Sequence, residues 1–152
     1  MSHIVILGAG LGGTIMAYEM KAKLRREDRL TVVNLGSSYS FVPSNPWVAV
    51  GWRQPAEITV DLAPVLRQRG IDLRPEGAER VEPALNQIRL NGGDVVGYDY
   101  LIIATGPALA FDEVPGLGPD GHTHSVCQTE HAVMAKAAFD KLVKAPGPVA
   151  IG

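Results

Sequence analysis

The chain has 152 residues, of which 46% are hydrophobic and 20% are charged, a composition typical of a globular α/β domain with a sizeable core. Its net charge is −2 and no basic block is present, which argues against a nucleic-acid surface. No stretch approaches the roughly 20 apolar residues of a membrane span. A single cysteine excludes an internal disulfide and a cysteine-rich zinc site, and we expect no metal site.

The most informative motif stands at the start of the chain. An apolar run at residues 4–7 leads directly into Gly-Ala-Gly-Leu-Gly-Gly at residues 8–13, and apolar residues at helical spacing follow. Gly8 allows a sharp turn, Gly10 allows a close approach of the backbone to a pyrophosphate, and Gly13 allows the helix to pack on the strand. Because amide groups at a helix start bind phosphate, this order predicts a dinucleotide site.

The second expected strand, residues 30–35, ends at a departure from the simple fingerprint. A classical site has an acidic residue here for the adenosine ribose, but Asn34 occupies the position. An amide also hydrogen-bonds a hydroxyl, without the charge of a carboxylate. We read residues 36–57 as a long irregular loop, which is usually functional at this length, and residues 61–69 as a helix capped by Asp61.

The next segments alternate between strands and turns. Strands are expected at residues 71–74, 79–82, 87–90 and 95–96, with a hairpin turn at residues 91–94, so part of this region forms a small antiparallel meander. An apolar run at residues 98–104 predicts a central parallel strand that ends in Ala104-Thr105-Gly106. The expected fold class is therefore α/β, a Rossmann-like domain with a parallel sheet, flanking helices and a β-meander insert.

The last part is expected to be loop at residues 107–124 and helix at residues 129–144. Thr129 is the predicted cap of this helix, and its predicted buried stripe is Ala132, Ala135, Phe139 and Leu142. Pro146-Gly147-Pro148 indicates a linker. We therefore expect a domain at residues 1–145, followed by a linker and the first strand of a second dinucleotide-type domain at residues 146–152, in the front part of a longer protein.

The single cysteine, Cys127, stands immediately before the expected helix, with His131 four residues later. A thiol at a helix start is favoured as thiolate, the nucleophile of redox exchange, and a nearby histidine can carry a proton. The alternative reading is that Cys127 is a small buried apolar residue and His131 a surface residue of the helix. Spacing alone favours this alternative.

Four segments together resemble the amino-terminal part of the sulfide:quinone oxidoreductase family, a relative of flavocytochrome c sulfide dehydrogenase. They are the glycine fingerprint, Phe41-Val-Pro-Ser-Asn-Pro-Trp47, Tyr98-Asp-Tyr-Leu-Ile-Ile-Ala-Thr-Gly106, and Ser125-Val-Cys127 with His131. The glycine and Ala-Thr-Gly motifs are shared by many flavoproteins with two dinucleotide domains. The Phe41–Trp47 segment with the downstream cysteine is more specific.

The resemblance implies FAD, with its pyrophosphate on the glycine fingerprint and its adenosine ribose near Asn34 and Leu35. It places Ser44 toward the flavin, and Arg80 and Val81 near the adenine through backbone groups. Cys127 matches the first of three cysteines typical of the family, the one near the flavin edge. The implied cofactor-binding residues are Gly8, Ala9, Gly10, Gly12, Gly13, Asn34, Leu35, Ser44, Arg80, Val81, Ala104, Thr105 and Gly106. The implied catalytic residues are Cys127 and His131.

The family reaction oxidises sulfide to polysulfide or sulfur and passes electrons through two further cysteines to FAD and then to a quinone. In family members those cysteines, most of the quinone pocket and a membrane-associating region lie beyond residue 152, so we expect residues 1–152 alone to be inactive. The expected partners are sulfide and quinone, and not nucleic acid. The expected location is cytoplasmic or peripheral to a membrane, because the early first strand leaves no room for a signal peptide. The oligomeric state is open.

Two other readings use the same scaffold or the same site. One is an NADH:quinone or disulfide-type reductase, which a second complete glycine fingerprint with a nicotinamide site would favour. The other is a non-catalytic nucleotide-binding module, which a gene ending at residue 152 would favour.

Overall fold

A computed structural model describes residues 1–151 and divides the chain into two compact units. Unit 1 comprises residues 1–39 and 60–107, and unit 2 comprises residues 40–59 and the chain from residue 108 onward. The sequence predicted one domain over residues 1–145. The structure divides these residues between the two units, and their assignment to a single FAD-binding domain stays a prediction.

Unit 1 is built on a four-stranded parallel sheet with the order β5-β2-β1-β9. The strands are β1 (His3–Leu7), β2 (Arg29–Val33), β5 (Asp72–Arg74) and β9 (Tyr100–Ile103). The predicted parallel strands are confirmed, with shorter bounds for the second and the last. β2 ends before Asn34 because the chain turns there, and Leu35 forms an isolated antiparallel bridge with Glu76.

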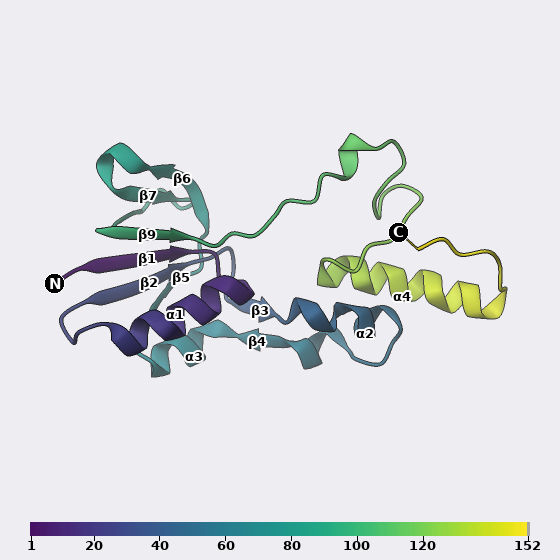
Figure 1. Cartoon of the computed structure of the whole chain (residues 1–152), viewed down its shortest axis with the longest axis horizontal. Coiled ribbons are helices and arrows are strands. Elements are labelled where there is room, and N and C mark those ends of the chain that lie inside the picture. The colour runs from purple at the N-terminus through teal and green to yellow at the C-terminus, as the bar shows by residue number, and fades with distance from the viewer. Residues whose placement is uncertain (152) are drawn as a thin grey trace. The chain divides into compact units, whose positions relative to one another are not determined.

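Successive side chains of a strand point to opposite faces of the sheet. The two faces are covered by different elements. Ile4 and Ile6 of β1 pack toward α1 (Leu11–Lys23) and α3 (Leu62–Gln68). Val5 and Leu7 pack against the meander of β6 (Ala78–Glu82), β7 (Gln87–Leu90) and β8 (Val95–Gly97). Figure 1 shows these two layers on either side of the sheet. The predicted meander is confirmed.

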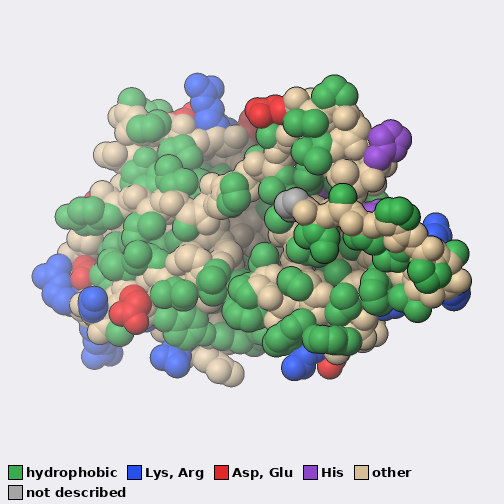
Figure 2. Space-filling view, turned by 45° about the vertical axis from the view of Figure 1, so that its right-hand side comes forward, with side chains coloured by type: hydrophobic (Ala, Val, Ile, Leu, Met, Phe, Trp, Pro, Cys, Tyr) green, Lys and Arg blue, Asp and Glu red, His purple; other side chains and the backbone are tan. Residues whose placement is uncertain are grey.

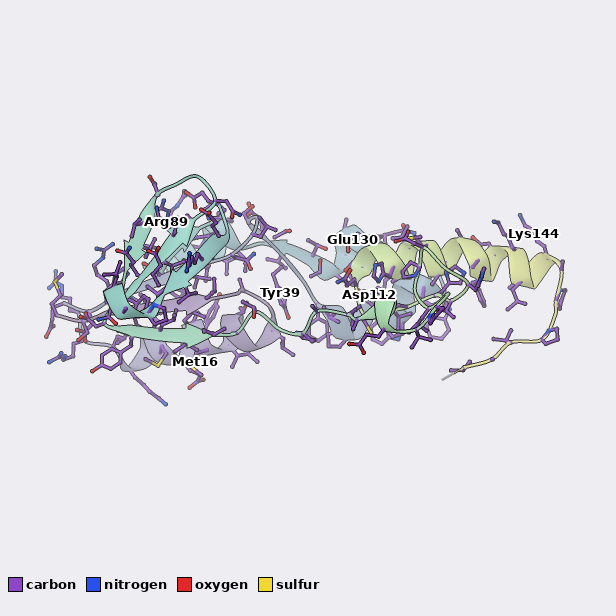
Figure 3. All side chains as sticks on the ribbon, turned by 90° about the horizontal axis from the view of Figure 1, so that it is seen from above. Met16, Tyr39, Arg89, Asp112, Glu130 and Lys144 are labelled. Atoms are coloured by element: carbon purple, nitrogen blue, oxygen red, sulfur yellow. The ribbon has the colours of Figure 1, made fainter. Side chains whose placement is uncertain are left out.

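Local signals explain several elements of unit 1. The Asp61 side chain accepts a hydrogen bond from the amide of Ala63 at 3.0 Å, so the predicted cap of α3 is confirmed. Asn86 follows η3 (Pro83–Leu85) and adopts a left-handed conformation with φ of 49°, which asparagine tolerates better than most residues. Figure 3 labels Arg89, which lies on β7 of the meander and contacts Glu82 at 3.3 Å.

The expected irregular loop at residues 36–57 is wrong in part. It contains β3 (Ser38–Ser40), which pairs with β4 (Thr59–Asp61), and three short helices: η1 (Val42–Ser44), α2 (Asn45–Ala49) and η2 (Pro55–Ile58). Each short helix begins with a proline in its first two positions. Proline fixes φ near the helical value, so it starts a helix even where no long apolar period is present.

Unit 2 packs α2 against α4 (Thr129–Lys144), whose bounds are those that the sequence predicted. Figure 3 labels Glu130 and Lys144 at the two ends of α4. Its buried contacts join Val48 and Ala49 to Ala132, with Ala135 partly buried. The predicted buried stripe is wrong for Phe139, which is 38% exposed. The five-residue α2 covers only the first turns of the 16-residue α4.

The remaining described segments carry little regular structure. The expected loop at residues 107–124 contains one short helix, η4 (Phe111–Glu113). Residues 149–151 form no strand, because a strand requires a hydrogen-bonded neighbour. Gly152 lies outside the described residues, and the second domain stays a prediction. Within residues 1–151, no helix has the length and apolar character needed to cross a membrane.

Charged side chains are scattered on the face of the molecule that Figure 2 shows, between broad hydrophobic areas. Several large apolar side chains are exposed in unit 1, among them Ile15 of α1 at 55% and Ile103 of β9 at 64%. β9 is an outer strand of the parallel sheet, a class of sheet that is usually covered. Apolar surface therefore remains open along this edge of unit 1.

The turn from α1 to β2 generates a prediction about pH. The Asp28 carboxylate accepts hydrogen bonds from the amide of Ser2 at 2.8 Å and from Nε of Arg25 at 3.2 Å. The Ser2 amide, followed by Arg25, lowers the pKa of Asp28. Asp28 therefore binds a proton more readily in the unfolded chain than in the folded protein. The ionised carboxylate stabilises the fold fully above about pH 4, and this contribution is lost as the pH falls through the folded-state pKa.

We expect Asp28→Asn to lower the melting temperature at neutral pH, because the variant loses the charge in these hydrogen bonds. The difference from the wild type should shrink progressively below about pH 4. Thermal unfolding followed by circular dichroism at several pH values measures this difference. A difference that stays constant down to about pH 2 would contradict the assignment.

Candidate functional site

The turn between β1 and α1 requires glycine at two positions. Gly8 has a φ of +100°, and a Cβ there would lie 2.5 Å from the carbonyl oxygen of Ala104. A Cβ on Gly13 would overlap the carbonyl oxygen of Gly8. The absence of both side chains lets α1 start directly at the end of β1 and beside the end of β9.

The other two glycines of the fingerprint face open space. A Cβ on Gly10 or Gly12 would meet no atom within 4 Å. Gly10 is the N-cap of α1 and offers no side-chain hydrogen bond to the first turn. The first amides of an α-helix have no partner within the helix and carry partial positive charge. The open side of this turn therefore fits an anionic group that approaches the backbone closely.

A cavity of about 310 Å³, here named the strand-end cavity, opens beside this turn. It lies where β1, β2 and β9 end, which is the edge at which parallel α/β sheets bind ligands. No charged residue is among those that line it. The lining residues are Leu7, Gly8, Val33, Asn34, Leu35, Gly77, Ala78, Asn91 and Thr105.

The structure brings only part of the expected nucleotide site to this cavity. Gly8, Asn34, Leu35 and Thr105, four of the expected cofactor-binding residues, line it, and Leu35 is 79% exposed. Ala9 is buried at 5% exposure, and its amide donates to Oδ1 of Asn34 at 2.9 Å. A contact of these residues with a nucleotide stays a prediction.

The residues that follow β9 border the glycine turn, with the carbonyl group of Ala104 next to Gly8. The Ala104 amide donates to the carbonyl oxygen of Leu7 at 2.7 Å, which ties the end of β9 to β1. Gly106 has a φ of +75°, and a Cβ on it would meet no atom within 4 Å. The backbone after Thr105 is thus open to close approach, as the Ala-Thr-Gly motif predicts.

Arg80 and Val81 do not line the strand-end cavity. Both lie on β6, where Arg80 pairs with Arg89 and Val81 pairs with Ile88 of β7. Val81 is partly buried against the core beneath the meander, and Arg80 is exposed. Their expected backbone contact with adenine stays a prediction.

Sequence reasoning missed Gly77, Ala78 and Asn91 as cavity residues. Gly77 has a φ of +76°, and its amide donates to the carbonyl oxygen of Asn34 at 2.9 Å. Asn91 donates from Nδ2 to the carbonyl oxygen of Glu76 at 2.9 Å. The glycine before β6 and the Asn-Gly turn are visible in the sequence. Their meeting at one edge of the sheet depends on the fold of the meander.

Unit 2 holds the other expected site residues. Ser44 ends η1 and is 6% exposed, and its amide donates to the carbonyl oxygen of Phe41 at 2.9 Å. Its expected contact with the flavin stays a prediction. Asn45, fully buried beside it, accepts a hydrogen bond at Oδ1 from Oγ1 of Thr129 at 3.1 Å. Thr129 therefore joins two helices, and the predicted cap is wrong: Gln128 occupies the N-cap.

The reading of Cys127 as a buried apolar residue is wrong, because the residue is exposed. Its amide donates to Oγ of Ser125 at 3.1 Å. His131 is partly buried, with its ring 5.6 Å from that of Phe111 and no partner for the buried Nδ1 among the described residues. The four-residue spacing does not itself bring the two together, because Cys127 precedes α4. Their catalytic roles stay a prediction.

The glycine turn yields a matched pair of variants. Gly13→Ala should destabilise the cofactor-free protein by several kcal/mol, because its methyl group overlaps the backbone of Gly8. Gly12→Ala places the same group in open space and improves helix propensity, so it should be neutral or stabilising by up to about 1 kcal/mol. Chemical denaturation of both variants measures the difference. Equal free energies of unfolding would contradict the close approach of residues 8 and 13.

Comparison with known proteins identifies relatives across nearly the whole chain. A family model described as pyridine nucleotide-disulphide oxidoreductase matches residues 2–143. The sulfide-quinone reductase of Aquifex aeolicus is 36% identical over 150 residues, covering 99% of this chain and 34% of that protein. The mitochondrial sulfide:quinone oxidoreductase of Mus musculus is 27% identical over 133 residues, covering 86% of this chain and 28% of that protein.

The fold is also that of solved structures. The crystal structure of the Aquifex aeolicus sulfide:quinone oxidoreductase superposes with a TM-score of 0.90 at 34% identity, covering 97% of this chain and 34% of that chain. The structure of NDH2 from Plasmodium falciparum in complex with NADH gives 0.71 at 22% identity, covering 97% of this chain and 30% of that chain, and shows the shared fold alone. The chain spans about a third of the length of these relatives.

These findings confirm the resemblance to sulfide:quinone oxidoreductases and the expected α/β class. The family is one of FAD-binding flavoproteins, and the open glycine turn beside the strand-end cavity fits such a cofactor. Gly10, Gly12 and the first amides of α1 are the groups that would hold its pyrophosphate. The chain belongs to the pyridine nucleotide-disulphide oxidoreductase family.

Proposed function

We propose that this chain is the FAD-binding part of an enzyme that oxidises sulfide and passes the electrons to a quinone. The observation that carries this proposal is the similarity to the Aquifex aeolicus sulfide:quinone oxidoreductase, at a TM-score of 0.90 and 34% identity over 97% of the chain. The structure of NDH2 from Plasmodium falciparum, which shares the fold, gives a lower TM-score of 0.71 at 22% identity. The sulfur product is polysulfide or sulfur.

In this proposal, the first turn of α1 and the strand-end cavity hold the two phosphates and the adenosine of FAD. Thr105 and Gly106, which follow β9, would contact the cofactor, since the backbone at Gly106 is open to close approach. Bound FAD supplies the two-electron chemistry that no side chain of this chain can perform alone. The chain's own contribution is to bind and orient this cofactor.

Cys127 supplies the proposed reactive thiol of this chain. It is exposed, which a sulfur nucleophile requires. His131 is the proposed proton carrier, since its buried Nδ1 is unpaired among the described residues and is free to bind a partner that these residues do not supply. Ser44 lies in the same unit and is the proposed contact toward the flavin.

An NADH:quinone or disulfide-type reductase is the second candidate. It is supported by the structures of NDH2 and of the NADH:rubredoxin oxidoreductase from Clostridium acetobutylicum, which share the fold at 22% and 20% identity. Proteins with different chemistries can share one fold at this level of sequence identity. The sulfide-oxidising reading is therefore preferred, and a non-catalytic nucleotide module is the third outcome of the test below.

The test compares two reductants on the complete protein without oxygen. We expect flavin absorption bands that bleach on addition of sulfide and return on addition of a quinone. Bleaching by NADH and not by sulfide would overturn the proposal in favour of the second candidate. A protein that binds FAD but is bleached by neither reductant would favour the non-catalytic module.

Cys127→Ser should lower sulfide oxidation by about 100-fold or more, because a serine hydroxyl does not replace a thiolate as nucleophile. The residue is exposed, so the melting temperature and the FAD content should stay close to those of the wild type. Steady-state turnover with sulfide and quinone measures the effect. Ser125→Ala, which removes only the hydroxyl that accepts the Cys127 amide, is the matched control. Full turnover in the Cys127 variant would exclude the thiol from the reaction.

A further inference from the structure

Asn34 bonds to three segments that meet at the end of β2. Its Oδ1 accepts from the amide of Ala9 at 2.9 Å, and its Nδ2 donates to the carbonyl oxygens of Leu35 and Gly36, each at 3.1 Å. Its backbone amide donates to Arg74 and its carbonyl oxygen accepts from Gly77, both at 2.9 Å. One residue thus links the glycine turn, the turn after β2 and the crossing from β5 to β6.

The side chain is almost fully used by these bonds. An asparagine amide has two hydrogens and two oxygen lone pairs. Both hydrogens are directed to the carbonyl oxygens of Leu35 and Gly36, and one lone pair is taken by Ala9. A ribose hydroxyl would find one lone pair and no donor.

The bond to Ala9 acts on the groups that face the phosphates. Ala9 stands between Gly8, with its φ of +100°, and Gly10, the N-cap of α1. Its carbonyl oxygen accepts from Oγ1 of Thr14 at 3.0 Å, so both of its backbone polar groups are held. The direction of the next amides is therefore fixed before any ligand arrives, and such preorganisation increases affinity.

We propose that Asn34 is a positioning residue that orients the glycine turn for the pyrophosphate through the Ala9 amide, and does not act by binding the ribose. This inference rests on the proposed binding of FAD at this turn. It also explains why an amide, and not the acidic residue of the simple fingerprint, occupies the position. A carboxylate would keep the bond to Ala9 but would face the carbonyl oxygens of Leu35 and Gly36 with no hydrogen to donate.

The first test separates positioning from ribose contact. The complete protein freed of FAD is titrated with ADP and with 2′,3′-dideoxy-ADP, which lacks the ribose hydroxyls. Asn34→Ala should weaken both probes by the same factor, about tenfold, which corresponds to one lost hydrogen bond. A loss confined to ADP would show a direct bond to the ribose and overturn the inference. Unchanged affinity for both probes would also overturn it.

The wild-type titration distinguishes failure of the inference from failure of the proposed function. If the wild-type protein binds none of ADP, 2′,3′-dideoxy-ADP and FAD, the proposed FAD site is contradicted, and with it the positioning role of Asn34. Wild-type binding together with either of the adverse results for Asn34→Ala contradicts the positioning role alone.

The second test uses Asn34→Asp and a pH series, and it does not depend on the alanine variant folding. The carboxylate should weaken ADP binding relative to the wild type at about pH 8, and the deficit should narrow as the pH falls toward about 4, the ordinary pKa of an aspartate, where the protonated acid again donates one hydrogen bond. Asn86→Asp makes the same change at an exposed position on the meander and should show no such dependence. Tighter ADP binding by the Asn34 variant at high pH would overturn the inference, because a carboxylate bound to the ribose gives that result.

Discussion

The backbone of Gly13 passes so close to the carbonyl oxygen of Gly8 that no side chain fits at Gly13, and the backbone of Ala104 excludes one at Gly8. This close approach decides where α1 begins, and α1 in turn covers one face of β1. With β1 held between β2 and β9, the ends of three parallel strands meet at one edge. The ends of β1 and β2 and the loops that leave this edge line much of the strand-end cavity beside the glycine turn, at the edge where parallel α/β sheets bind ligands.

The resulting site differs from one built on charged side chains. No lysine or arginine is among the residues that line the strand-end cavity, so the positive character comes from backbone amides at the start of α1. Backbone groups cannot be adjusted by rotamer changes, and their direction must be set by neighbouring bonds. Asn34 accepts from the amide of Ala9, and Thr14 donates to its carbonyl oxygen. Affinity in such a site depends on how rigidly the loops are held, as well as on which residues touch the ligand.

Much of this could be predicted from sequence because the signals are local. The fingerprint and its flanking apolar residues predicted β1 and α1, and an uninterrupted helical period predicted α4 with its exact bounds. The parts that were missed depend on distant segments. Asn91 reaches the strand-end cavity only because the meander folds back over β1. Thr129 bonds Asn45 because α2 and α4 pack together, and no pattern near Thr129 indicates that partner. Phe139 fits the helical spacing of the buried residues of α4, but within residues 1–151 no helix packs over it.

The central claim is that the diphosphate of FAD lies against the open amides at the start of α1. A crystal structure of the complete protein with FAD measures this most directly. The account predicts phosphate oxygens within about 3 Å of the backbone nitrogens of residues 10–12, with the Ala9 amide still bonded to Asn34. A structure in which FAD is bound but the diphosphate lies elsewhere, or in which a side chain fills this turn, would contradict it.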